Sequence, residues 1–177
     1  MREFTSLTDF GLHLVSLEAT QAVALSSALE RVLVRIEAEA KAEIGHYQPA
    51  VGPFAAWAPL AESTEAEKAR LGYDADVPLE RTLDLRDSIS HEAGVLEGIV
   101  GSTSDVMVYQ ELGTLTIPPR AVLGPAAVRC KAYIEKEIGE AAVAGLLGLD
   151  RLASPLSTAG VNAYENKIAA DYPFKTA

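Results

Sequence analysis

The segment from residue 109 to residue 127 constrains the fold of this chain more than any other, because glycine and proline punctuate it. The preceding run, 106 to 112, is rich in β-branched and aromatic side chains that alternate in type, which predicts a strand. Gly113 then provides a residue that turns at positive φ without a Cβ clash. Pro118 and Pro119 cannot donate to a backbone ladder, and they hold the preceding residues extended. The pattern therefore predicts a strand followed by a forced turn.

A helix is predicted to follow this turn. Pro125 fits the first turn of a helix, where its missing N–H has no helical partner anyway. Arg120 near a helix start is electrostatically unfavourable with the helix dipole. We therefore expect Arg120 to have a carboxylate partner, and Glu111 is a candidate. From local chemistry alone, a plain strand–turn–helix connection explains these residues equally well.

Two helical patterns frame the rest of the chain. Residues 6 to 17 carry apolar side chains at spacings of three and four after a capping-box-like start at Ser6, although a strand through residues 10 to 14 is the competing interpretation. Residues 19 to 44 predict a long, alanine-rich amphipathic helix that ends at Gly45. A second helix is expected from residue 123 or 125 to about 147.

Three short strands are predicted between these helices. A helical or turn segment through Arg86 precedes a strand at 88 to 92, and Gly94 turns the chain into a strand at 95 to 101. The run at 106 to 112 completes an antiparallel meander. The expected fold class is α+β, with a long N-terminal helix and a C-terminal helix packed on a small antiparallel sheet, in one domain over residues 1 to 147.

Residues 46 to 79, called the arm below, differ in composition from both helices, with four prolines and two glycines. Structureless loops of this length are uncommon in compact domains. We expect an extended arm that docks through large side chains, with folding back onto its own core as an equal alternative. Residues 62 to 71 are expected to form one or two helical turns capped by Ser63. The expected anchors are Tyr47, Phe54, Trp57, Leu60 and Tyr73.

The composition limits the function of the chain. It has 177 residues and a net charge of −10, whereas affinity for nucleic acid comes mainly from lysine and arginine. The usual explanation for such a charge is solubility. The functional explanation is that the protein lines a DNA channel, where a negative wall keeps the DNA from binding. No signal-like start is present, and no apolar run approaches the roughly 18 residues of a membrane span. We expect a soluble protein that is made in the cytoplasm and has no membrane partner.

The titratable residues do not form a pattern typical of an enzyme. The three histidines, His13, His46 and His91, lack zinc-protease or triad spacing, and no Walker or Gly-x-Ser-x-Gly segment is present. Cys130 is the only cysteine, so no intrachain disulfide can form, and it is expected to be a small core residue and not a nucleophile. We therefore expect no catalytic, cofactor-binding or metal-binding residues.

Several motifs resemble the neck or tail-completion proteins, a family of minor tail components of long-tailed bacteriophages. That family has a Tyr…Glu-Phe/Leu-Gly-Thr segment leading through Pro-Pro-Arg or Pro-Ala into a helix that begins Phe/Val-Leu-x-Pro-Ala. Residues 81 to 89 also match the family's Thr-Gly-x-Leu-Arg-x-Ser-Ile stretch, except that Leu83 stands where glycine is expected. The Trp57-x-Pro-Leu60 pattern is similar to Mu-like virion morphogenesis proteins. The candidate assembly or turn residues are Tyr109, Glu111, Gly113, Thr114, Pro118, Pro119, Arg120 and Pro125.

The resemblance covers roughly residues 5 to 147 and implies a structural role in the virion. It implies a symmetric homo-oligomeric ring at the head–tail junction, assembled in the host cytoplasm, around double-stranded DNA that passes without specific binding. Its implied neighbours are other neck proteins, such as adaptor, stopper or tail-terminator proteins. Residues 148 to 177 have no counterpart in the family, and we expect them to become ordered only in the assembly. The alternative is an acidic binding module, either an adaptor or an inhibitor that mimics DNA, and oligomeric state discriminates the two.

Overall fold

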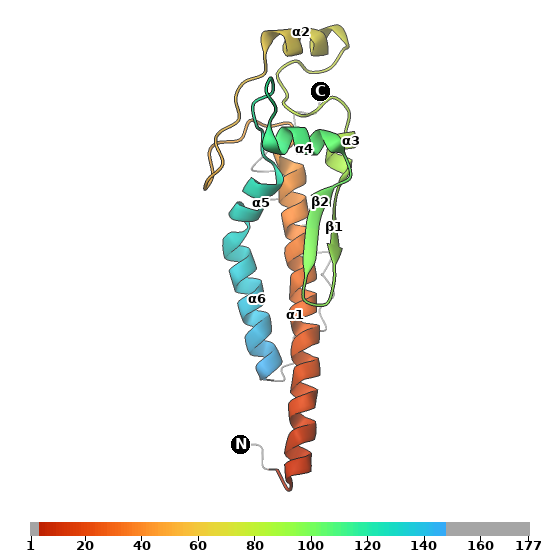
Figure 1. Ribbon diagram of the computed structural model, residues 1–177, viewed down its shortest axis with the longest axis vertical. Coiled ribbons are helices and arrows are strands. Elements are labelled where there is room, and N and C mark those ends of the chain that lie inside the picture. Colours follow the sequence, from red (N-terminus) through yellow and green to blue (C-terminus); the bar gives the residue numbers. More distant parts are fainter. Residues whose placement is uncertain (1–3, 148–177) are drawn as a thin grey trace. The chain divides into compact units, whose positions relative to one another are not determined.

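Figure 1 shows the computed structural model of the chain, which describes residues 4–147. This part of the chain contains six helices and one sheet of two strands, so the predicted α+β class is confirmed. The described residues form two units. The first comprises residues 4–32, 93–98 and 133–147, and the second comprises residues 33–92 and 99–132.

Helix α1, Leu7–Glu43, is continuous over 37 residues and contributes to both units. The competing strand through residues 10 to 14 is therefore wrong, and the two predicted helical stretches are one helix. Ser6 Oγ accepts a hydrogen bond from the Asp9 N–H at 3.1 Å, as a capping residue does. Gly45 lies just beyond the helix at φ 94°, which confirms the predicted stop.

The first unit is held together by small side chains. Ala24 and Ala28 on α1 pack against Ala141 on helix α6, Lys131–Leu146. A Cβ added at Gly145 would lie only 2.7 Å from Cα of Gln21, so the two backbones approach closely there. The small alanine side chains of α1 permit such an approach.

The second unit contains the larger apolar core. Its centre gathers residues that are far apart in the sequence, from α1, the arm, the hairpin and the segment after residue 104. Burying apolar side chains from so many elements is the main stabilising term for such a unit. The buried members are Ala40, Ile44, Trp57, Ile89, Met107, Val122 and Ala126.

The sheet is smaller than predicted. Strands β1, Ile89–Ala93, and β2, Gly98–Ser102, form one hairpin with the expected turn at Gly94, whose N–H donates to the Glu97 carbonyl at 2.7 Å. The predicted third strand is wrong, because this run forms helix α4, Asp105–Leu112.

Packing explains why α4 is a helix. In α4 only Met107 is buried, while its neighbours Val106 and Val108 are exposed together with Tyr109 and Leu112. A helix that buries a single side chain on one face accounts for this pattern. The alternation of buried and exposed residues that a strand would need is absent. β-propensity is weak enough for such packing to override it.

The sequence predicted the places of two short helices, but not their exact bounds. Helix α2, Glu62–Arg70, lies in the arm where one or two turns were expected, but its N-cap is Ala61 and no side chain caps it, so the predicted Ser63 cap is wrong. Helix α3, Asp84–Asp87, corresponds to the segment expected through Arg86.

The C-terminal helical region is divided. The single helix predicted to run to about residue 147 is in fact α5, Leu123–Arg129, followed by α6, with Cys130 at the joint. Cys130 has ψ −4°, far from the value of about −42° in a regular α-helix, and this interrupts the ladder. The 148–177 segment lies outside the described residues, as does the expectation made for it.

Candidate functional site

The candidate motif forms the connection between α4 and α5. Gly113 ends α4 at φ 73°, in the left-handed region that favours glycine, as predicted. The turn after it is tight, because a Cβ at Gly113 would lie 3.0 Å from the Ile117 carbonyl oxygen and from the Pro119 ring. A side chain at this position would therefore meet both backbone strain and a steric clash.

Thr114 organises the tip of this connection. Its N–H donates to the Ile117 carbonyl at 2.8 Å, and its Oγ1 accepts from the N–H groups of Thr116 and Ile117 at 3.3 and 3.0 Å. A hydroxyl that accepts from the backbone two and three residues ahead is a common way to fix a turn. Leu115 is held at the tip with its side chain fully exposed.

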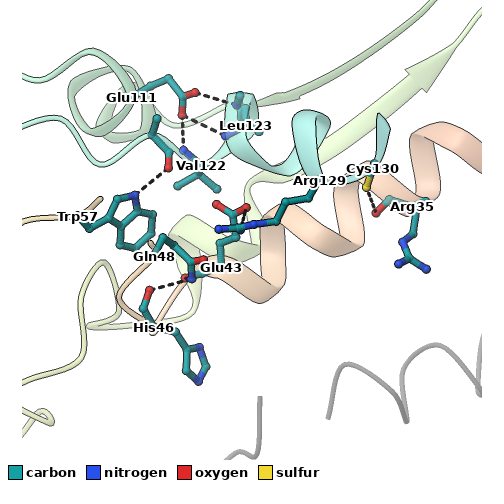
Figure 2. A network of polar contacts seen from close by, with 12 residues as sticks. Arg35, Glu43, His46, Gln48, Trp57, Glu111, Val122, Leu123, Arg129 and Cys130 are labelled. Atoms are coloured by element: carbon teal, nitrogen blue, oxygen red, sulfur yellow. Dashed lines mark hydrogen bonds and ion pairs between the residues drawn. The ribbon is translucent and has the colours of Figure 1, made fainter. Parts of the chain in front are cut away.

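Glu111 caps helix α5 (Figure 2). One carboxylate oxygen accepts from the Val122 and Leu123 N–H groups at 2.7 and 3.1 Å, and the other accepts from Gly124 at 3.0 Å. The next residue, Pro125, has no N–H, so every donor at this helix start is accounted for. A carboxylate at a helix N-terminus is also favoured by the helix dipole.

Arg120 does not pair with Glu111, so that prediction is wrong. The Glu111 carboxylate is occupied by the helix cap. The buried Arg120 guanidinium donates instead to carbonyl oxygens of the arm: Nε and Nη2 to Ala58 at 3.3 and 3.0 Å, and Nη2 to Pro59 at 3.1 Å. Burial lowers the pKa of Arg120 from its usual value. Its role in the described structure is to fasten the arm to the motif.

Trp57 anchors the arm from within the core. Its side chain is buried, and its Nε1–H donates to the Ala121 carbonyl at 2.9 Å (Figure 2). Phe54 lies against α5 so closely that a Cβ at Gly124 would come within 2.2 Å of its ring. The sequence left open whether the arm extends outward to dock or folds back onto its own core. Trp57 and Phe54 pack in the second way.

Tyr47 and Leu60 hold the arm to itself. The Tyr47 hydroxyl donates to Asp76 Oδ1 at 2.8 Å and accepts from the Leu60 N–H at 3.2 Å. Burial raises the pKa of the Tyr47 phenol, and Asp76 adds to that effect. Tyr73, the remaining expected anchor, is exposed.

A buried charge pair near this site was missed by the sequence analysis. Glu43, in the last turn of α1, is 1% exposed and forms an ion pair with Arg129 of α5 (Figure 2). Burial raises the pKa of Glu43 to about 8 despite the nearby arginine. Gln48 Nε2 donates to the carbonyl oxygens of Glu43 and His46 at 3.1 and 2.9 Å. Other charged residues precede Glu43 in α1, so nothing in the sequence distinguishes this buried glutamate from those on a solvent-exposed face.

His91 and Cys130 also acquire structural roles. His91 Nδ1 contacts Glu37 Oε2, and Lys41 Nζ lies 2.5 Å from Glu37 Oε1. Burial opposes ionisation of Glu37, but Lys41 and His91 outweigh it and lower its pKa. Cys130 is buried with Sγ 4.0 Å from the Arg35 carbonyl oxygen, and burial raises the thiol pKa, so it is the core residue that was predicted.

Comparisons with known proteins leave the function to be argued from the motif and its geometry. No protein-family model, curated protein or solved structure matches the chain. Within residues 4–147, no helix is both long and apolar enough to cross a membrane. In the same range, no group of three or more histidine, cysteine, aspartate or glutamate side chains is placed to hold a metal ion.

Proposed function

We propose that this protein is a structural component of the head–tail connector of a long-tailed bacteriophage. In this role it forms a symmetric ring around the DNA channel at the neck and acts in tail completion. It acts by assembly through surfaces and carries no catalytic residues. The motif resemblance supplies the class of protein, and one structural observation supports the mode of action.

That observation is a set of apolar side chains that α4 and the following turn present to solvent. Val108, Tyr109 and Leu112 lie on one side of α4 and are each more than half exposed, and Leu115 is fully exposed. Residues three and four apart share one face of a helix. Exposed apolar patches mark protein–protein interaction sites. We call these four residues the assembly face.

The assembly face stands on a well-fixed support. Met107, on the buried side of α4, packs into the core, and Glu111 ties α4 to the start of α5 through three hydrogen bonds. The Arg120 N–H donates to the Gln110 carbonyl at 2.6 Å, which closes the turn. A support fixed before binding lowers the entropy lost on association. The motif residues are therefore suited to hold a contact surface in place.

The first unit offers further apolar side chains for assembly. The part of α1 that belongs to it exposes large apolar residues over several turns, and the end of the described chain exposes more. A ring needs two different surfaces on each subunit, because its contacts are head-to-tail. The exposed residues are Leu7, Phe10, Leu12, Leu14, Val15, Val23, Val143, Leu146 and Leu147.

The charge of the chain agrees with a conduit role. Its net charge is −10, and proteins that hold DNA do so mainly by neutralising phosphates with lysine and arginine. A channel through which DNA must pass needs the opposite property. The charge therefore supports a ring around DNA without specific binding.

Electron microscopy of the purified protein tests this proposal. The wild-type chain is expected to give rings with a central hole, and Leu112→Glu and Leu115→Glu are expected to abolish them without unfolding the protein. Leu71→Glu is a matched control, because it also charges an exposed leucine, outside the assembly face. Rings that persist in both assembly-face variants would refute the role of that face, and the absence of any ring in the wild type would argue against the neck function.

A further inference from the structure

A pocket of about 680 Å³ opens in the second unit, and the proposed function does not use it. Its walls come from residues 59–64 and 68 of the arm, residues 77–85, and residues 104–120. Its volume falls within the range of roughly 300–1,000 Å³ that is typical of small-ligand sites.

The walls of the pocket are largely apolar. Leu60, Val77 and Leu79 contribute side chains from the arm, and Leu85 and Ile117 contribute from the other segments. Such walls favour an apolar body, because burying it removes apolar surface from water. Orientation and specificity would then come from the few polar groups that face the same space.

Arg120 is one of these polar groups, and its charge is unmatched. Nε and Nη2 donate only to neutral carbonyl oxygens, those of Ala58 and Pro59. Within residues 4–147, Nη1 makes no hydrogen bond and no carboxylate forms an ion pair with this guanidinium. A desolvated guanidinium is stabilised most by a carboxylate that it can bind through its N–H groups.

The charged groups on the α3 side of the pocket have partners of their own. Arg81 Nη2 lies 3.0 Å from Glu67 Oε1, and Asp84 accepts from the Thr82 hydroxyl at 2.6 Å. Arg81 has a carboxylate partner and Asp84 is exposed to solvent, so neither needs a ligand to stabilise its charge.

Lys68 and Glu80 are the remaining charged groups in the walls of the pocket. Lys68 Nζ donates to the Val77 carbonyl, and although burial lowers the pKa of Lys68, Asp74 and Glu80 act in the opposite direction. Among the described residues, Arg120 differs from Lys68 because no aspartate or glutamate offsets the lowering of its pKa by burial.

Gln110 adds a second unmatched group to the pocket. Its side-chain Oε1 is buried, and no donor among the described residues reaches it. A buried acceptor without a donor is unfavourable, because it has lost its water without replacement. A donor on a ligand would remove this cost.

We propose that this pocket binds a carboxylate carried on an apolar body. The carboxylate pairs with Nη1 of Arg120, and an N–H or O–H group of the same ligand donates to Gln110 Oε1 after the Gln110 side chain turns toward the pocket. The same chemistry is offered by an aspartate or glutamate in a segment of another protein and by a free small carboxylate. The proposal does not depend on the neck function.

Saturation-transfer NMR on the full chain tests it, since the method detects small ligands that bind a protein weakly. The small probe is N-acetyl-phenylalanine, and its amide, which lacks the carboxylate, is the control. The protein-segment probe is acetyl-Ala-Asp-Tyr-Pro-amide, with the peptide carrying Asn in place of Asp as its control. We expect each acid that binds to do so roughly tenfold more tightly than its neutral control. Binding by the peptide alone identifies a protein segment as the source, and binding by the small acid identifies a free carboxylate.

Two variants separate binding from folding. Gln110→Met removes the unsatisfied acceptor, so it is expected to keep or raise the melting temperature while weakening the binding of the acid probes several-fold. Arg120→Lys keeps the charge and removes the planar donors, and it is expected to weaken binding at least as much. The proposal is overturned if neither acid probe binds the wild-type chain, if acids and neutral controls bind equally, or if both variants keep wild-type affinity.

Discussion

At the scale of single residues, the positions of glycine and proline were the most predictable from sequence. Glycine at positive φ and proline in a first helical turn follow from covalent geometry, which no tertiary contact can change. Gly113 and Pro125 accordingly stand where they were expected. The partners of charged side chains were not predictable, because they depend on elements distant in sequence: Glu111 caps α5, and Glu43 meets Arg129.

Gly113→Val is expected to lower the free energy of unfolding by about 2 kcal/mol or more, since it adds left-handed strain to a steric clash. Gly72→Val is the matched control: Gly72 also has positive φ, 82°, but an added Cβ would meet nothing within 4 Å. The control is expected to lose about 1–2 kcal/mol, from strain alone. Urea unfolding measures both, and equal losses would show that the clash at Gly113 contributes nothing.

Glu111→Ala is expected to destabilise the fold by about 2 kcal/mol, because it leaves three backbone N–H groups of the α5 start without their acceptor. Glu62→Ala is the control, since Glu62 also lies in a first helical turn but caps nothing. Its loss should be a few tenths of a kcal/mol. If both variants unfold at the same urea concentration, the capping role of Glu111 is wrong.

Glu43 gives the stability a predictable pH dependence. Its pKa is raised in the folded state to about 8, so the folded protein binds a proton more tightly than the unfolded chain does. As the pH rises, the protein therefore loses stability through this group. The loss begins above the usual carboxyl pKa and is complete near pH 8. Relative to the wild type, Glu43→Gln should gain stability steadily from about pH 5 to pH 8. A constant difference across that window, measured by urea unfolding, would contradict the raised pKa.

At the scale of elements, long periodic patterns predicted the secondary structure correctly, whereas short runs of residues did not. The long helix, its stop and the hairpin were predicted, since many residues or a glycine turn specify each of them. The run that forms α4 has strand-like composition but packs only Met107 inward, and local preference cannot anticipate that. The break at Cys130 left no signal in the apolar stripe, because both helices continue the same pattern.

The arm is fastened to the core of the second unit by Trp57. Trp57→Ala is expected to release the arm, because it removes a core side chain and the hydrogen bond to Ala121. The variant should be cut by protease within residues 46–79 much faster than the wild type, as local unfolding exposes the backbone. Tyr73→Ala is the control, since Tyr73 is exposed in the same arm. Equal cleavage rates in the two variants would show that Trp57 is not the anchor.

At the scale of the whole molecule, the proposed function requires the subunits to associate. The motif, the assembly face and the acidic charge together support a ring around DNA, and none of them requires chemistry at a single site. The acidic adaptor or DNA-mimic alternative shares the charge but not the need for self-association. Oligomeric state therefore separates the two functions more directly than any mutation.

The measurement that decides is the mass of the purified chain in solution, by light scattering over a concentration series. The neck proposal predicts a defined multiple of 18.8 kDa that stays constant over a range of concentrations, as a closed ring requires. The Leu112→Glu variant is expected to reduce that mass to one subunit. A wild-type mass of one subunit at every concentration would contradict the ring and favour the acidic binding module.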